Sequence, residues 1–272
     1  MKKLINLQPS KPVRVLLGLL PFIILLLLYI GASDARLADN PNDKLLPSLN
    51  SFVEAIDRMA FTADKRSGGY LFWQDSYSSL KRLFTGVGIS AALALSLGVL
   101  MGAIPFFRAK LSPLVTAISL IPPMAILPIL FIIFGLGEFS KVVLIVIGIA
   151  PFITRDVLQR VQEIPSEQII KAQTLGANTW QIILRVILPQ IMPRLLAAVR
   201  LSLGAAWLFL IAAEAIAATD GLGYRIFLVR RYLSMDVILP YVAWITLLAF
   251  IIDYLIRLAS AKLYPWFHSQ EN

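Results

Sequence analysis

Three stretches of this chain, residues 15–32, 83–107 and 111–137, contain no charged side chain. An α-helix needs about 20 predominantly apolar residues to cross the hydrocarbon core of a bilayer, and uncharged runs of about 18 or more are typical of such spans. The whole chain is 58% apolar and 15% charged, whereas soluble domains carry about 25% charged residues. The sequence therefore predicts an all-α integral membrane protein with one lipid-embedded bundle.

Six spans are expected along the chain. The third contains four prolines and must be kinked, because proline removes a backbone donor and clashes with the preceding turn. The first follows a basic start, so a cleaved signal peptide with a site at Ser33-Asp34-Ala35 is the alternative interpretation. The predicted spans are residues 15–32, 83–107, 111–137, 142–154 with its flanking turns, 195–218 and 237–256.

The distribution of basic residues gives the orientation. With the N-terminus inside, the inner segments hold fourteen of the 25 Lys and Arg residues and the outer segments hold the other eleven. Because Lys and Arg accumulate in cytoplasmic loops, we expect a multi-pass protein with both termini in the cytoplasm. The same rule accounts for the pI of 9.9 without invoking nucleic acid as a partner.

These spans divide the chain into four parts. Residues 1–32 form the basic N-terminus and first helix, 33–74 an outer segment, 75–262 the core with five spans, and 263–272 an inner tail. In the outer segment, apolar residues recur at helical spacing and predict a short amphipathic helix. This helix either lies on the membrane or packs against the bundle. Its apolar stripe is Leu49, Phe52, Val53, Ile56, Met59 and Ala60.

The largest inner segment, residues 155–194, contains a glycine between two short helical patterns. Pro165 suits the first turn of a helix that runs to about Leu175, and Gly176 is placed to end it in a left-handed cap. Asn178 then offers an N-cap, and Gln181 completes a capping-box pattern. An apolar face follows at i, i+3, i+4, i+7 and i+8 before two prolines, Pro189 and Pro193, close the second helix. That face is Trp180, Ile183, Leu184, Ile187 and Leu188.

This inner loop has three interpretations. It is a plain amphipathic helix that leads into the fifth span, or a rigid docking element for the groove of a partner protein. A DNA-binding helix-turn-helix is disfavoured, because the segment is tethered to spans at both ends and lacks a clustered basic face.

The same loop resembles the cytoplasmic EAA loop of binding-protein-dependent ABC-importer permeases. In that pattern Glu-Ala-Ala is followed by three residues, Gly, nine residues and Ile-x-Leu-Pro. Ala172, Gly176, Leu188 and Pro189 fall in register, with Val186 at the Ile position. Two positions depart from the pattern, since Ile170 and Lys171 stand where Glu and the first Ala are expected.

The resemblance extends through "TLGAN" (174–178), "RLSLGAAWLFLIAAEAIAATDGLGYRI" (200–226) and "DVILPYVAWITLLAFIIDYLIR" (236–257), and it covers about residues 75–262. It is strongest to the nitrate/sulfonate/taurine subgroup. It implies the six-helix fold of type I importer permeases in the inner membrane. It also implies a homodimer, two ATPase subunits, and a periplasmic or lipid-anchored solute-binding protein. ATP-Mg would be bound by the ATPase, with no cofactor on this chain. The implied ATPase-docking residues are Ala172, Thr174, Leu175, Gly176, Ala177, Trp180, Leu188 and Pro189.

Two further sites lie near the fifth span. Glu214 is a carboxylate deep in an apolar run, and such groups usually face a cavity or a partner. We expect Glu214, together with Arg200 in the same span, to line or gate the translocation pathway. The alternatives for Glu214 are an internal salt bridge or a position nearer the outer surface. The turn that follows is glycine-rich and permits a tight reversal. By resemblance it faces the binding protein through Asp220, Gly221, Gly223 and Tyr224.

Catalytic and metal motifs are absent from the sequence. It has no cysteine, its single histidine is His268 in the tail, and it contains neither a Walker A motif nor Gly-x-Ser-x-Gly. We therefore expect that the chain is not an enzyme. The resemblance implies a transport subunit, with a small anion such as nitrate, a sulfonate, taurine or bicarbonate as solute. The rival functions are an ion-coupled carrier or channel, which usually shows inverted repeats and several buried charges, and a membrane scaffold.

Overall fold

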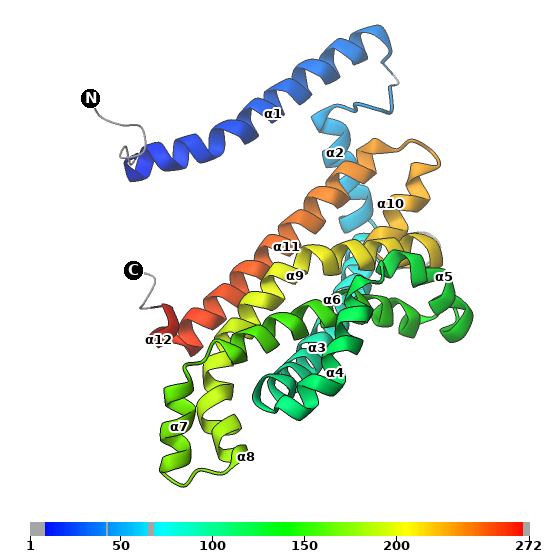
Figure 1. The fold of residues 1–272 in the computed structure, drawn as a ribbon. Coiled ribbons are helices and arrows are strands. Elements are labelled where there is room, and N and C mark those ends of the chain that lie inside the picture. Colours follow the sequence, from blue (N-terminus) through cyan, green and yellow to red (C-terminus); the bar gives the residue numbers. More distant parts are fainter. Residues whose placement is uncertain (1–8, 42, 65–67, 269–272) are drawn as a thin grey trace.

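The computed structural model describes residues 9–41, 43–64 and 68–268, and within these ranges the regular secondary structure is helical (Figure 1). This confirms the predicted all-α class. In chain order the elements are α1 (Lys11–Asp39), α2 (Leu49–Ile56), the π-helical η2 (Asp57–Phe61), α3 (Leu71–Ala103), α4 (Pro105–Leu120), α5 (Pro123–Phe134), α6 (Glu138–Gln162), α7 (Ser166–Thr174), α8 (Thr179–Ile182), the π-helical η3 (Ile183–Ile187), α9 (Leu188–Ala217), α10 (Leu222–Arg230), α11 (Met235–Leu263) and α12 (Pro265–His268).

Five helical segments of the described chain are long and apolar enough to cross a membrane. They are α1, α3, α6, the segment from α8 through α9, and α11. The third predicted span is not one kinked helix: α4 ends at Leu120, and α5 begins at Pro123 with a bend of 97°. The Pro122-Pro123 pair explains the break, because a residue before proline is driven out of the helical region. Ile121 and Pro122 are extended accordingly. Counted as one span, α4 and α5 correspond to the third predicted span and bring the number of candidate spans in the described chain to six, as predicted.

The core of the bundle is formed where α3, α6 and α9 pack together. Glycines on α3 face branched side chains of α6, so the two backbones approach closely, as small residues allow in membrane proteins. A Cβ added at Gly86 would lie 2.8 Å from Ile145 Cγ2, and one at Gly98 would lie 2.6 Å from Val157 Cγ1. Close helix contact is therefore built into the sequence of α3.

The predicted outer helix is formed by α2 and η2, and it packs against α11 rather than standing away from the bundle. Ala55, Met59 and Ala60 are buried. Leu49, Val53 and Ile56 of the predicted stripe are exposed, so the helix packs on the bundle through part of the stripe, and contact of the rest with the membrane stays a prediction.

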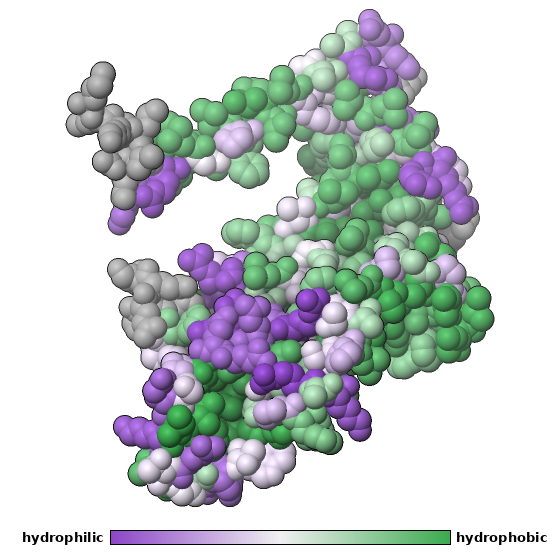
Figure 2. Space-filling model, in the orientation of Figure 1, coloured by the Kyte–Doolittle hydropathy of each residue, from purple (hydrophilic) through white to green (hydrophobic). Residues whose placement is uncertain are grey.

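Helix α1 stands apart from the other spans (Figure 1). It is held near its C-terminal end, where the Tyr29 hydroxyl donates to the Pro47 carbonyl oxygen at 2.7 Å and the Ser33 hydroxyl donates to the Leu46 carbonyl oxygen at 2.9 Å. Figure 2 shows apolar surface along α1 and over the region of α5. Polar residues gather at the end of the bundle that carries α7 and α12.

We predict that Gly98→Val destabilises the bundle by about 1–3 kcal/mol, because the new side chain overlaps Val157 and overpacks the α3–α6 contact. The measurement is thermal unfolding of the detergent-purified chain. Gly88→Val is the matched control, since Gly88 lies on the same helix and a Cβ there meets no atom within 4 Å. Equal melting temperatures for the two variants would contradict the packing described here.

Candidate functional site

The inner loop folds into a compact projection, here called the knob, made of α7, residues 175–178 and α8 (Figure 1). Gly176 has a φ of 84° and ends α7 in the left-handed conformation, as predicted. The Gly176 N–H donates to the Gln173 carbonyl oxygen at 2.9 Å, and the Ala177 N–H donates to that of Ala172 at 3.0 Å. These two bonds make a Schellman motif, which fixes the path of the chain out of the helix.

The start of α8 is fixed as firmly as the end of α7. The Gln181 N–H donates to the Asn178 side-chain oxygen at 2.9 Å, and the Asn178 N–H donates to Gln181 Oε1 at 2.9 Å. This is the reciprocal capping box expected from the sequence. The knob is therefore a two-helix unit with a backbone-bonded turn.

Apolar side chains cover the outside of the knob. Leu175 is 79% exposed and Trp180 is 62% exposed, and Ile170 and Leu184 are also exposed. The single apolar face predicted from Trp180 to Leu188 is wrong, because residues 183–187 form a π-helical turn that changes the helical period. Ile183 and Ile187 are buried in the bundle, so Trp180 and Leu184 are left on the surface.

The prediction that Pro189 and Pro193 close the second helix is also wrong. The helical segment continues from Thr179 to Ala217, with both prolines inside it. The Leu188 N–H donates to the Ile183 carbonyl oxygen in the wider π turn. This wider turn lies immediately before Pro189, where proline removes a helical donor. The knob and the fifth span thus share one unbroken helical segment of 39 residues.

The remaining predicted docking residues lie in or beside the knob. Ala172 and Ala177 are half-buried, and Thr174 is exposed, with its hydroxyl donating to the Ile170 carbonyl oxygen at 2.9 Å. Leu188 and Pro189 belong to the first turn of α9, outside the knob itself.

Polar contacts tie the knob to the spanning helices. Gln190 Nε2 on α9 donates to Gln168 Oε1 on α7 at 3.0 Å, and Arg194 Nη1 on α9 donates to Glu163 Oε2 at 2.9 Å. A hydrogen bond from Arg160, supported by Arg194, holds the pKa of Glu163 below its usual range. Knob, α6 and α9 are thus linked at their common end.

At the opposite end of the bundle, charged side chains from three elements converge on Arg82 of α3. Its Nη1 donates to Glu214 Oε1 of α9 at 2.7 Å, its Nη2 to Asp220 Oδ1 at 2.5 Å, and its Nε to Glu138 Oε2 of α6 at 2.6 Å. Arg82 is 3% exposed and the Glu214 side chain is fully buried. We call this set the ionic network: Ser79, Arg82, Glu138, Lys141, Glu214 and Asp220.

Backbone donors of the α9–α10 turn complete the network. The Gly223 N–H donates to Glu214 Oε2 at 2.9 Å, and the Gly221 N–H donates to Asp75 Oδ1 at 3.0 Å. Gly221 has a φ of 116°, and a Cβ there would lie 2.6 Å from the Glu214 carboxyl carbon. The predicted tight reversal is confirmed, and both glycines are buried, whereas Asp220 and Tyr224 are partly exposed.

Asp220 is ionised within this turn. Burial opposes its charge, but hydrogen bonds from Ser78 and Arg82 outweigh burial and lower its pKa.

Asp75 also joins α3 to α10 and α11, since it accepts from Arg225 Nε at 2.8 Å and from the Tyr241 hydroxyl at 3.2 Å.

The structure does not bring the two predicted pathway residues together. Arg200 Nε donates to Asp253 Oδ1 of α11 at 2.8 Å. Arg200 and Glu214 lie about 21 Å apart along α9, because a helix rises about 1.5 Å per residue. The contacts of Glu214 match the alternative of an internal salt bridge, while a role for it in gating stays a prediction.

Sequence reasoning missed Arg82 as the partner of Glu214. It lies one residue before the predicted second span of residues 83–107, although the helix that forms this span, α3, begins at Leu71. A signal was present, because Asp75, Ser79, Arg82, Gly86 and Ser90 follow one another at intervals of three and four residues. Such spacing places polar and small residues on one helical face.

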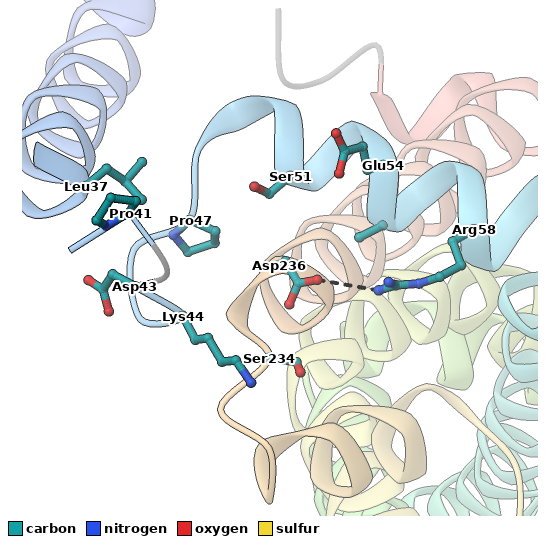
Figure 3. A pocket seen from close by; sticks show the side chains of 11 residues that line it. Leu37, Pro41, Asp43, Lys44, Pro47, Ser51, Glu54, Arg58, Ser234 and Asp236 are labelled. Atoms are coloured by element: carbon teal, nitrogen blue, oxygen red, sulfur yellow. Dashed lines mark hydrogen bonds and ion pairs between the residues drawn. The ribbon is translucent and has the colours of Figure 1, made fainter.

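A polar pocket of about 510 Å³ lies on the side of α2 that faces the α10–α11 turn (Figure 3). Lys44, Glu54 and Asp236 line it, and Arg58 Nη2 donates to Asp236 Oδ2 at 3.4 Å across it.

Among the described residues, no group of three or more His, Cys, Asp or Glu side chains is arranged to hold a metal.

The family model and the similar proteins that match this chain are all membrane components of transport systems. Residues 86–266 match the family described as binding-protein-dependent transport system inner membrane component. The chain is 36% identical over 194 residues to the taurine transport system permease protein TauC of Escherichia coli (strain K12), an alignment covering 71% of this chain and 70% of that protein. It is 30% identical over 157 residues to the bicarbonate transport system permease protein CmpB of Synechococcus elongatus, covering 57% and 56%.

A solved structure is similar as well. A chain of the MetNI methionine ABC transporter in an inward-facing conformation superposes with a TM-score of 0.60 at 25% identity, covering 71% of this chain and 94% of that chain.

We predict that Arg82→Met destabilises the protein by about 3–5 kcal/mol, because it leaves the Glu214 carboxylate buried without its cation. The measurement is the melting temperature of the chain in detergent. Arg58→Met is the matched control, since Arg58 is 63% exposed and its ion pair with Asp236 lies at the surface, where such pairs contribute about 0–1 kcal/mol. An Arg82→Met variant as stable as the control would show that the network does not hold the bundle together.

Proposed function

This chain belongs to the family of binding-protein-dependent transport system inner membrane components and is a membrane-spanning permease subunit of an ABC importer, and we propose that its knob is the surface on which the ATPase subunit docks. The observation that carries the proposal is a rigid turn with exposed apolar side chains. Leu175 and Trp180 are the most exposed of them, and short helices with such anchors fit a hydrophobic groove.

The departure from the EAA pattern changes the chemistry expected at this contact. Ile170 is exposed where the family pattern has Glu. The docking surface proposed here is therefore mainly apolar, and it includes Ile170 in place of a charged contact.

We propose further that two copies of the chain pair in the membrane and that each binds one ATPase subunit, which carries ATP-Mg. Both termini and the knob then face the cytoplasm, and the ionic network faces outward. A solute-binding protein would approach that outer end, where Asp220 and Tyr224 of the α9–α10 turn and the pocket beside α2 offer polar groups (Figure 3).

The single helical segment Thr179–Ala217 supports a mechanism of coupling. Closure of the ATPases on ATP would displace the two knobs, and α9 would carry this displacement as a rigid rod to the ionic network. Rocking of the two copies would then open the pathway alternately to either side.

The solute we propose is a small oxyanion such as a sulfonate, nitrate or bicarbonate, because similar permeases are named for taurine and bicarbonate transport. In such importers the separate binding protein would determine most of the selectivity.

We predict that Gly176→Val abolishes co-purification of the ATPase, since a β-branched residue is strained at a φ of 84° and the turn of the knob would distort. Gly135→Val is the matched control, because Gly135 also has a positive φ and open space around it but lies between α5 and α6.

Leu175→Ser, which leaves the backbone unchanged, should weaken the complex with the ATPase about tenfold, because it removes an apolar anchor that contributes about 1–2 kcal/mol to binding. Intact complexes for both knob variants would place the dock elsewhere.

The rival function is an ion-coupled carrier, and transport in vesicles separates the two. Vesicles that contain this chain alone should not accumulate taurine or bicarbonate under an imposed proton or sodium gradient. Accumulation should require the ATPase, the binding protein and ATP. Uptake by the chain alone would overturn the importer function.

A further inference from the structure

The Glu138 carboxylate is bound in the way that proteins bind exogenous oxyanions. Arg82 Nε donates to its Oε2 at 2.6 Å, Arg82 Nη2 donates to its Oε1 at 2.7 Å, and Lys141 Nζ donates to Oε1 at 2.8 Å. A bidentate guanidinium with a second cation on the same oxygen pair is the arrangement that recognises carboxylates and phosphates.

The cations are buried while the carboxylate is not. Arg82 is 3% exposed and Lys141 is 4% exposed, whereas the Glu138 side chain is 61% exposed. Glu138 therefore covers the two cations from the side that is open to the surroundings.

Glu214, in contrast, is built into the fold. Its carboxylate is fully buried and also accepts from the Ser79 hydroxyl at 2.8 Å and from the Gly223 N–H at 2.9 Å. The Glu138 carboxylate has its described hydrogen bonds with Arg82 and Lys141 alone. Rotation of the Glu138 side chain thus breaks its ion pairs with Arg82 and Lys141 without unpacking a helix. Arg82 keeps its ion pairs with Glu214 and Asp220, so the face of Arg82 toward Glu138 and the Lys141 ammonium become open to an anion.

The surroundings of Glu138 add to the attraction for anions and leave room for its movement. Glu138 is the first residue of α6, a 25-residue helix whose N-cap, Gly137, provides no side-chain cap. The free N–H groups of such a first turn favour negative charge. A Cβ at Gly135 or Gly137 would meet no atom within 4 Å, so these two residues of the preceding turn face open space.

We propose that Arg82 and Lys141 form a binding site for an oxyanion, which the Glu138 carboxylate fills in this conformation. The occupant is a sulfonate, carbonate or phosphate group that replaces the two carboxylate oxygens when Glu138 swings away. It comes either from a free solute or from the phosphate of a lipid headgroup. The solute source deepens the proposed transport function, but binding to the isolated chain needs neither the ATPase nor the binding protein, so the two proposals fail independently.

The test measures sulfate binding to the full chain in nanodiscs of neutral phosphatidylcholine, as saturable thermal stabilisation relative to chloride at equal ionic strength. Glu138→Gln should bind sulfate with an apparent dissociation constant about tenfold or more below that of the wild type, because the internal competitor is gone. Glu138→Asp, which keeps the carboxylate, should resemble the wild type. No saturable sulfate effect in Glu138→Gln would overturn the proposal.

Two controls distinguish this site from general electrostatics. Asp236→Asn removes one carboxylate from a surface ion pair with Arg58, changes net charge equally, and should leave sulfate binding at the wild-type level. Adding Lys141→Gln to Glu138→Gln should remove the gain. A gain in the Asp236 variant, or one that survives loss of Lys141, would contradict the assignment.

A third arm repeats the Glu138→Gln titration in nanodiscs with anionic phosphatidylglycerol. If the sulfate response disappears there, the site is filled by a lipid phosphate. If it persists, the occupant is the free anion.

Discussion

The buried ion pair between Arg82 and Glu214 constrains the rest of the structure. A charge taken out of water is stable only when it is paired and hydrogen-bonded, and in the membrane no solvent supplies the missing partner. Arg82 comes from α3 and Glu214 from α9, so this pairing fixes the two helices at one height. Backbone donors of the α9–α10 turn then complete the coordination of Glu214, which explains why Gly221 and Gly223 stand where a Cβ would collide. Apolar packing and glycine contacts between α3 and α6 bring the helices together, and the ionic network sets their register.

The helical segment from Thr179 to Ala217 connects this network to the knob. One end carries exposed apolar side chains on a turn that is fixed by a Schellman motif and a capping box. The other end carries a carboxylate that cannot move without breaking several hydrogen bonds. A permease subunit has to convert an event at one face of the membrane into a change at the other, and a continuous helix anchored at both ends is suited to do so. The π turn at residues 183–187 precedes Pro189 and lets the helix continue through both prolines.

Local chemistry was readable from the sequence, and long-range pairing was not. Gly176, Asn178 and Gln181 act on neighbours within a few residues, so their roles follow from spacing alone. The π turn escaped prediction because a regular period was assumed through residue 188, and this assigned Trp180 and Ile187 to one face. Arg82 escaped because a charge beside an uncharged run is normally solvated, and only the tertiary fold places Glu214 against it. The same limit applies to Arg200, which pairs with Asp253 of α11 instead of sharing a site with Glu214.

Rigid transmission from the knob to the ionic network is tested most directly by distances between paired spin labels. The chain has no native cysteine, so labels can be placed at two exposed positions through Arg185→Cys and Ile216→Cys, which leave the capping box and the network intact. Doubly labelled chains diluted with unlabelled ones should show one narrow distance near the backbone separation of about 46 Å, because a straight helix rises about 1.5 Å per residue. That distance should stay constant between the nucleotide-free and ATP-bound complexes. In the proposed dimer, chains labelled at position 185 alone should show a separation between the two labels that changes on ATP binding. A broad distribution, or an end-to-end distance that changes on ATP binding, would show that the helix bends and does not act as the rod.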